Sequence, residues 1–124
     1  MVARIAQLAL DVHDVELQAR FWSEALGMTA DLGDDGEGML YPPEDAPKWM
    51  QTIYLQKVDE DKQGKLRVHF DLRPEDGDVD REVQRLLRLG ATRAEVGQTG
   101  EEGFTVLADP EGNEFCVLHG DPPR

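Results

Sequence analysis

Leu-Arg-Val-His-Phe-Asp-Leu-Arg, residues 66–73, alternates apolar and polar side chains without a break. This period of two predicts a β-strand that buries one face and presents the other to polar surroundings. The polar face carries His69 and, two residues later, Asp71. A carboxylate on the same face can orient or charge an imidazole, so His69 is the best-placed candidate for chemistry in the chain.

The composition limits the partners of the chain. Its 124 residues are typical of one domain with its own apolar core, which needs no disulfide or structural metal. With 26 acidic and 13 basic residues, the formal net charge is -13 at pH 7. Nucleic acids and anionic membranes are bound through basic patches, so we expect neither as a partner.

The sequence also indicates a cellular compartment. It has no basic and apolar signal segment at its start, and no apolar run near the roughly 20 residues that a membrane helix requires. Its single cysteine, Cys116, cannot form an internal disulfide, which agrees with a reducing environment. We therefore expect a cytoplasmic protein.

The expected elements fall into two similar halves separated by a charged connector at residues 59–65. Alternating and amphipathic patterns define the elements, and glycines and prolines separate them. The first half holds strands at residues 4–12, 28–33, 39–41 and 51–58 and a helix at 15–26. The second half holds strands at residues 66–73, 91–96, 104–108 and 114–118 and a helix at 79–89.

The two halves also resemble each other in sequence where their helices end. Leu-Gly-Met-Thr, residues 26–29, is similar to Leu-Gly-Ala-Thr, residues 89–92. Each glycine is placed to end its helix. A repeated order of elements together with this repeated motif favours an internal duplication.

Two motifs carry a resemblance to a known superfamily. Phe-Trp-Ser-Glu-Ala-Leu-Gly, residues 21–27, is similar to the Phe-Tyr-x-x-x-Leu-Gly helix end of the vicinal oxygen chelate superfamily. Asp-Pro-Glu-Gly-Asn, residues 109–113, is similar to the turn that precedes the last strand in that superfamily. The resemblance spans about residues 3–119. The superfamily includes glyoxalase I, extradiol dioxygenases, fosfomycin-resistance enzymes and bleomycin-resistance proteins.

The resemblance implies an α+β fold in a single glyoxalase-like domain over residues 1–124, with two βαβββ modules at about 3–58 and 66–119. These modules are expected to form a curled, eight-stranded mixed sheet around an open cavity, with the helices outside. The apolar residues expected beneath the helices are Leu8, Leu10, Ile53, Leu55, Val68, Phe70, Leu72, Phe115 and Val117. The residues expected to face the cavity are Gln7, Ala9, Asp11, Tyr54, Gln56, Arg67, His69, Asp71, Glu114 and Cys116.

The resemblance also implies positions for a metal. Carried over residue by residue, the four ligand positions of the metal-dependent members fall at Gln7, Gln56, His69 and Cys116. Hard divalent cations prefer carboxylate and imidazole ligands, and two neutral amides add no anionic charge. A Cys116 thiolate suits zinc, but with His69 it makes only two good ligands where zinc usually has three or more. We therefore favour no cofactor and keep a divalent metal as the alternative.

Two classes of function follow from the resemblance. The first is metal-independent binding of a small molecule in the cavity, similar to the bleomycin-resistance branch. The second is an enzyme, either a metal-dependent lyase, isomerase or dioxygenase, or a metal-free enzyme in which His69 is the general base. Members of the superfamily often pair, so we expect a homodimer. The expected ligand-binding residues are Gln7, Asp11, Trp49, Tyr54, Gln56, Arg67, His69, Asp71, Glu114 and Cys116.

Overall fold

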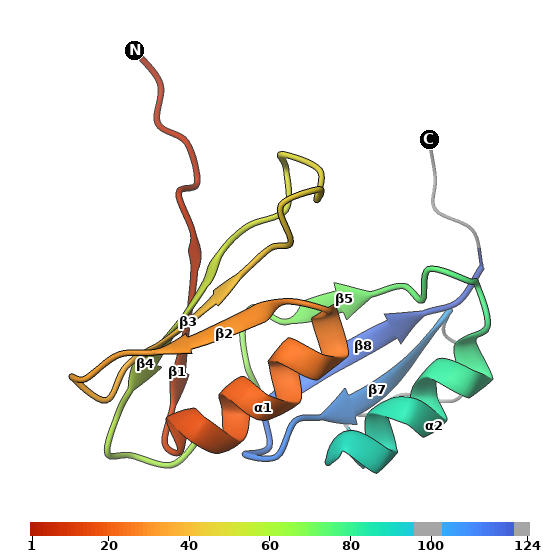
Figure 1. The fold of residues 1–124 in the computed structure, drawn as a ribbon. Helices are drawn as coiled ribbons and strands as arrows, with labels where there is room; N and C mark the ends of the chain where they lie inside the picture. Colours follow the sequence, from red (N-terminus) through yellow and green to blue (C-terminus); the bar gives the residue numbers. More distant parts are fainter. Residues whose placement is uncertain (96–102, 121–124) are drawn as a thin grey trace. The chain divides into compact units, whose positions relative to one another are not determined.

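The computed structural model describes residues 1–95 and 103–120 (Figure 1). It divides into two compact units, Met1–Asp61 and Lys62–Arg124, and each is described by itself. The boundary between the units lies inside the connector expected at residues 59–65. Neither helix in the described part of the chain has the length and apolar character needed to cross a membrane.

Unit 1 contains one helix and a four-stranded mixed sheet. Its elements are β1 (Leu8–Val12), α1 (Val15–Leu26), β2 (Thr29–Leu32), β3 (Gly38–Tyr41) and β4 (Ile53–Lys57). The strands lie in the order β1-β4-β3-β2, in which β1 runs parallel to β4 and the other pairs are antiparallel. The first and last strands of the unit are therefore neighbours.

Helix α1 begins and ends as its sequence predicts, and it packs on β2, β3 and β4. The Asp14 side chain accepts a hydrogen bond from the Leu17 amide, which satisfies one of the free amides in the first turn. Gly27 adopts the left-handed conformation just past the helix. Phe21 and Trp22 are buried in an edge-to-face contact with ring centroids 5.0 Å apart, so this pair supplies much of the apolar area that α1 removes from water.

Unit 2 repeats the order of elements seen in unit 1. Its elements are β5 (Phe70–Leu72), α2 (Val79–Leu89), β6 (Thr92–Arg93), β7 (Phe104–Ala108) and β8 (Glu114–Leu118). The strands lie in the order β5-β8-β7-β6, with β5 parallel to β8. Each unit is thus β-α-β-β-β with the same strand order, which confirms the predicted α+β fold built from two βαβββ modules.

The strand registers show how closely the units correspond. In unit 1 Ala9 lies opposite Tyr54, and in unit 2 Asp71 lies opposite Cys116. Each residue of the second pair comes 62 positions after its counterpart in the first pair. His69 lies just before β5, as Gln7 lies just before β1. Structurally equivalent positions can therefore be compared residue by residue.

The strand expected at residues 66–73 is much shorter than its alternation predicts. Only Phe70–Leu72 pairs with β8, and Val68, expected beneath the helix, is 81% exposed. The Leu66 amide donates to the side chain of Glu114 instead of to a neighbouring strand. Alternation alone cannot create a strand where the backbone has no ladder partner, so the prediction for residues 66–69 was wrong.

Other strand ends also differ from the predictions. β1 begins at Leu8 and not at residue 4, and Ile5, ahead of it, is 72% exposed. β6 holds only two residues of the strand expected at 91–96. Residue 96, the last residue of that expected strand, lies outside the described residues. Leu8, Leu10, Phe70 and Leu72 are only partly buried. The apolar residues of β4 and β8 form the core as expected: Ile53, Leu55, Phe115 and Val117.

The turn at residues 109–113 is organised by one buried carboxylate. Asp109 is 2% exposed, and its Oδ1 accepts hydrogen bonds from the amides of Glu111 and Asn113 at 2.9 and 3.0 Å. Its Oδ2 accepts from the Asn113 side-chain amide at 2.9 Å. Gly112 follows with φ of 89°, a value that disfavours any residue with a Cβ. This network fixes how β7 is joined to β8.

Replacing Asp109 by alanine should destabilise the protein by about 3 kcal/mol, because buried donors lose a charged acceptor. Chemical denaturation at neutral pH measures this as a lower free energy of unfolding. Asp45→Ala, at an exposed loop position, is the control and should change stability by less than about 0.5 kcal/mol. Equal effects of the two substitutions would contradict the assigned role of Asp109.

Candidate functional site

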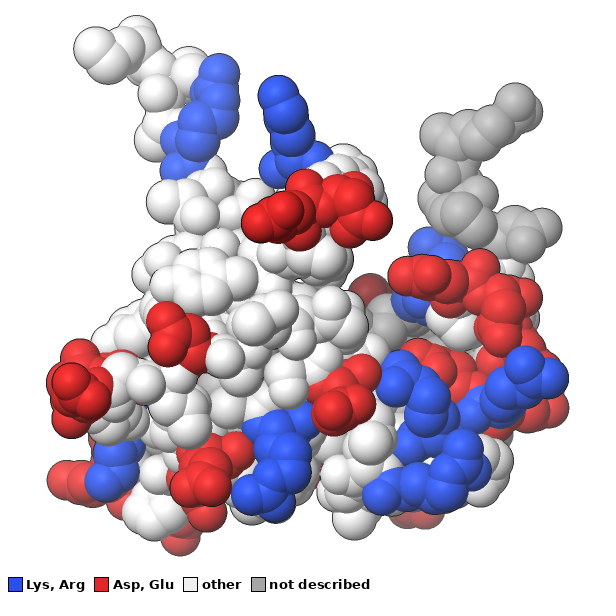
Figure 2. All heavy atoms as spheres, in the orientation of Figure 1, with Lys and Arg blue, Asp and Glu red and all other residues white. Residues whose placement is uncertain are grey.

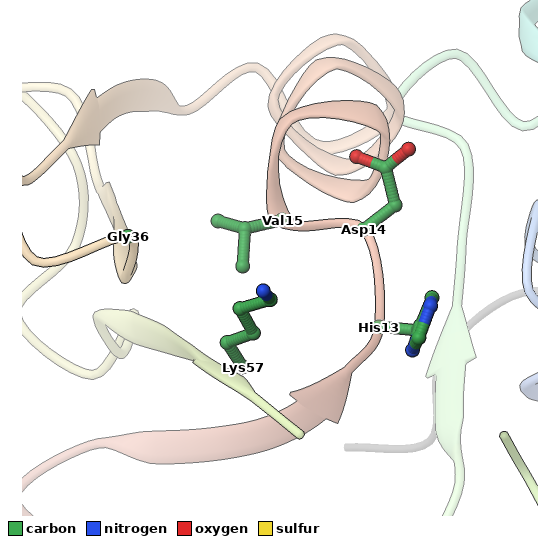
Figure 3. A pocket seen from close by; sticks show the side chains of 5 residues that line it. All are labelled: His13, Asp14, Val15, Gly36 and Lys57. Carbon is green, nitrogen blue, oxygen red and sulfur yellow. The ribbon is translucent and has the colours of Figure 1, made fainter. Parts of the chain in front are cut away.

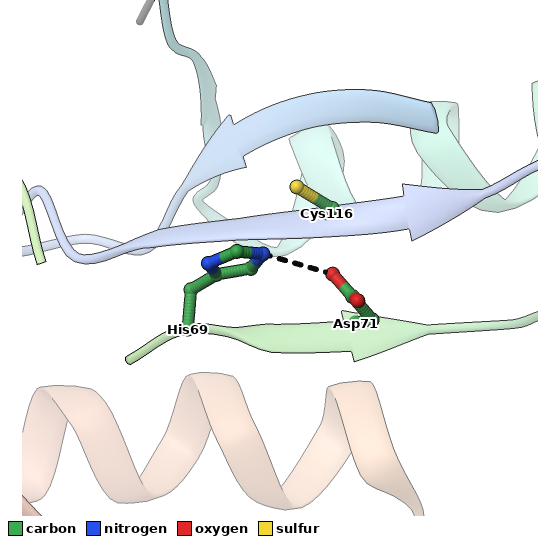
Figure 4. A group of neighbouring side chains, drawn as sticks. All are labelled: His69, Asp71 and Cys116. Carbon is green, nitrogen blue, oxygen red and sulfur yellow. Dashed lines mark ion pairs between the residues drawn. The ribbon is translucent and has the colours of Figure 1, made fainter. Parts of the chain in front are cut away.

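Three chemically reactive side chains meet in unit 2: His69, Asp71 and Cys116 (Figure 4). Asp71 in β5 lies opposite Cys116 in β8. His69 precedes Asp71 by two residues, so the local backbone brings both side chains toward the same place. One ligand atom from each of the three residues lies within 4.8 Å of the others. Parallel pairing of the first and last strands of the unit therefore builds the cluster.

His69 and Asp71 form a polar contact that is open to solvent. The imidazole Nε2 lies 3.0 Å from Asp71 Oδ1, and the two side chains are 42% and 47% exposed. Figure 4 shows the His69 ring turned along β5 toward the Asp71 carboxylate. A carboxylate bound to one ring nitrogen fixes the orientation of the imidazole and leaves the other nitrogen for a ligand or a proton.

Cys116 is the buried member of the cluster, with 6% of its surface exposed. Burial raises the pKa of its thiol, and the charge of Asp71 and a hydrogen bond to that carboxylate raise it further. Lys65 acts in the opposite direction without reversing the shift. A thiol held protonated in this way is a poor nucleophile, so the structure does not favour covalent catalysis by Cys116.

Glu114, two residues before Cys116, is engaged in holding the start of unit 2. Its carboxylate lies 2.9 Å from Lys62 Nζ and accepts a hydrogen bond from the Leu66 amide at 3.0 Å. Lys62 Nζ also donates to the carbonyl of Gly64. Burial alone would raise the pKa of Glu114, but the bonds from Lys62 and Leu66 lower it below its ordinary value. Glu114 therefore anchors residues 62–66 to β8.

The remaining predicted ligand-binding residues are distributed over both units. Arg67, in unit 2, is exposed. Trp49 lies in a loop of unit 1 with 76% of its surface exposed. Gln7, Asp11, Tyr54 and Gln56 also belong to unit 1.

The register clarifies which residues of unit 1 correspond to the cluster of unit 2. Asp11 lies opposite Gln56, and Ala9 lies opposite Tyr54. The position equivalent to Cys116 is therefore Tyr54, one strand repeat before Gln56. The sequence could not decide between Tyr54 and Gln56 as the equivalent of Cys116, because the answer depends on which residues of two distant strands pair.

Burial and nearby acidic groups raise the pKa of the Tyr54 phenol. Its side chain is half-buried, and burial raises the pKa of the phenol above 10.0. The negative charge of Glu37 and a hydrogen bond to its carboxylate raise the pKa further, with a smaller effect from Asp35. Glu37 also accepts a hydrogen bond from the Lys57 amide at 2.7 Å. Tyr54 thus stays a neutral hydrogen-bonding group at physiological pH.

Unit 1 also contains a hollow that the sequence did not reveal. The space measures about 390 Å³ and is open to solvent (Figure 3). It lies where β1 leads into α1, close to the end of the parallel strand β4. The hollow forms because Val12 pairs with Lys57, which brings the end of β4 beside the start of α1. The sequence does not show this pairing. The lining residues are His13, Asp14, Val15, Gly36 and Lys57.

Two basic side chains of α2, Arg81 and Arg85, are paired with nearby acidic groups. Figure 2 shows several basic side chains over α2, next to acidic ones. Arg81 lies 3.5 Å from both Asp76 and Asp78, and Arg85 lies 2.7 Å from Glu82. These pairs are local contacts within and just before the helix, so the charges of Arg81 and Arg85 are compensated by neighbouring carboxylates.

A family model described as a glyoxalase-like domain matches residues 7–118, which is most of the chain. A search of curated proteins found no significant match.

Solved structures show the same fold at low sequence identity. The fosfomycin resistance protein FosX from Mesorhizobium loti is 15% identical, with a TM-score of 0.71 over 98% of this chain and 94% of that chain. A FosX variant from Listeria monocytogenes, bound to Mn(II) and 1S,2S-dihydroxypropylphosphonic acid, is also 15% identical, with a TM-score of 0.71 over 98% and 93%. A glyoxalase/bleomycin resistance protein/dioxygenase family enzyme from Burkholderia phytofirmans is 17% identical, with a TM-score of 0.68 over 94% and 98%.

Removing the charge of Glu114 should release residues 62–66. Glu114→Gln keeps an acceptor for the Leu66 amide but loses the attraction to Lys62, at a cost of about 1–2 kcal/mol. Hydrogen exchange of the Leu66 amide and denaturation together measure the effect. The control is Arg20→Gln, which breaks an ion pair with side chains 69% and 75% exposed and should cost less than about 0.5 kcal/mol. Unchanged exchange at Leu66 would contradict the anchoring role.

The ionisation of Tyr54 should be visible in an alkaline titration of tyrosinate absorbance. We expect one component above the ordinary pKa of 10.0, absent in Tyr54→Phe and shifted down in Glu37→Gln, which removes the negative charge. Because the folded state holds this proton more tightly, its contribution to stability is complete below pH 10.0 and is lost as the pH rises through the folded-state pKa. An unshifted titration in Glu37→Gln would rule out the electrostatic cause.

Proposed function

The chain belongs to the glyoxalase-like domain family, within the vicinal oxygen chelate superfamily, and on this premise we propose that it binds a small molecule at the His69–Asp71 pair. We further propose that binding needs no Mn(II)-type metal. The proposal is one of ligand recognition in unit 2, with the imidazole of His69 as the central contact. Cys116 lies behind the pair and contributes a neutral thiol.

The observation that carries the proposal is the exposed polar contact between His69 and Asp71. Asp71 holds Nε2 of the imidazole at 3.0 Å, which leaves Nδ1 as the nitrogen available to an incoming group. Both side chains are about half exposed, so a ligand can reach them without opening the core. An oriented imidazole beside a carboxylate offers a donor, an acceptor and a negative charge within one small area.

The side chains at the family's metal positions support metal independence. Mn(II) prefers oxygen and nitrogen ligands, with carboxylates to offset the cost of removing its water. Here Gln7 and either Gln56 or Tyr54 supply neutral groups, and Cys116 supplies sulfur in place of a carboxylate. This donor set does not fit a hard cation such as the Mn(II) bound by FosX from Listeria monocytogenes.

A second candidate function is a metal-free enzyme in which His69 acts as general base. The favouring observation is again the contact between Nε2 and Asp71, because a carboxylate that orients an imidazole stabilises the ring once it has accepted a proton. Nδ1 would accept the proton from the substrate. Unlike simple binding, this function requires turnover.

The binding function can be tested by thermal shift on protein treated with chelator, against a panel of anionic, neutral and cationic metabolites and antibiotics. We expect at least one compound to raise the unfolding midpoint in the absence of metal. His69→Gln and Asp71→Asn should each weaken the binding of that compound by about tenfold, or ~1.4 kcal/mol, since each removes one polar contact.

The matched control is His119→Gln. His119 is another exposed histidine of unit 2, and its Nε2 lies 2.9 Å from the hydroxyl of Thr105. This variant should bind the compound with unchanged affinity. Binding that appears only after Mn(II) is added would overturn metal independence, and equal binding by His69→Gln would place the ligand elsewhere. Turnover that is abolished in His69→Gln would select the second candidate function.

A further inference from the structure

We infer that His69, Asp71 and Cys116 form a zinc site contained entirely within unit 2. The zinc site shares His69 and Asp71 with the ligand site proposed above, but only the zinc site uses the Cys116 sulfur as a ligand. A readout of the metal–thiolate bond therefore distinguishes failure of one proposal from failure of the other. It differs from the metal positions of the superfamily in two respects. It includes Asp71, and it takes no ligand from unit 1.

The donor set suits zinc. Imidazole nitrogen, carboxylate oxygen and thiolate sulfur are the three kinds of ligand that zinc takes from proteins, and three protein ligands leave one position open for water or substrate. Asp71 supplies the third ligand that Cys116 and His69 lack by themselves. The sequence alone did not assign this role to Asp71, because its nearness to Cys116 follows from the β5–β8 register.

The distances agree with a site that needs only small side-chain adjustments. In a tetrahedral zinc site with these donors, ligand atoms lie roughly 3.3–3.8 Å apart. The three donor atoms here lie within 4.8 Å of one another, and Nε2 of His69 lies 3.0 Å from Asp71 Oδ1. His69 and Asp71 are on the surface and can rotate toward the buried sulfur. When the zinc–sulfur bond forms, the thiol proton passes to solvent.

The duplicated fold provides an internal comparison. At the positions equivalent to His69, Asp71 and Cys116, unit 1 carries Gln7, Ala9 and Tyr54, respectively. None of these three side chains is a customary zinc ligand. The same backbone thus presents a full set of donors in one unit and none in the other.

Cobalt substitution tests the site, because a cobalt–thiolate bond gives a near-ultraviolet charge-transfer band. The full chain, stripped with chelator, should show this band on titration with Co²⁺ and lose it when Zn²⁺ is added. Cys116→Ala should abolish the band. The thiolate band is the deciding readout, because a preference for zinc over Mn(II) is common to nearly every site with these donors.

Affinity measurements with a competing chromophoric chelator complete the test. His69→Gln and Asp71→Asn alter exposed residues, so they remain informative even if Cys116→Ala fails to fold. Each should weaken zinc binding by at least roughly tenfold. Gln7→Ala and His119→Gln should leave it unchanged. Absence of the thiolate band, or a loss in Gln7→Ala equal to that in His69→Gln, would overturn a site confined to unit 2.

Discussion

Parallel pairing between the first and last strands of each unit is the constraint on which this structure depends. It brings β1 beside β4 and β5 beside β8, although each pair is far apart in the chain. Parallel strands cannot be joined by a tight turn, and in each unit the intervening helix and two strands make the connection. The helix covers the sheet, and the pairing decides which side chains of the two strands become neighbours.

The same strand pairing occurs in both units, whereas the reactive side chains differ between them. Both units use one strand order and one register, so the backbone offers two equivalent places for a site. Apolar pairs such as Leu8 with Ile53 and Phe70 with Phe115 keep the sheets packed in both. Only unit 2 places an imidazole, a carboxylate and a thiol at the intervening positions. The two units therefore share one backbone arrangement and differ in the side chains that they place on it.

Much of the fold could be predicted from the sequence because its signals are local. The Asp14 cap, the glycine helix ends and the turn at Asp109 each act within a few residues. The length of β5 could not be predicted, because the alternation at residues 66–69 does not reveal whether a neighbouring strand is there to pair with. For the site, His69 and Cys116 were found, but the closeness of Asp71 to Cys116 required a register between distant strands. The hollow near His13 and Lys57 was missed for the same reason.

The burial of Cys116 bears on how the protein responds to oxidants. Disulfide exchange and oxidation to sulfenic acid both require an accessible thiolate. Here the only sulfhydryl of the chain is 6% exposed, and burial, together with the neighbouring carboxylate of Asp71, raises the pKa of the thiol. The folded chain is thereby protected from covalent cross-linking to its own copies through this sulfur.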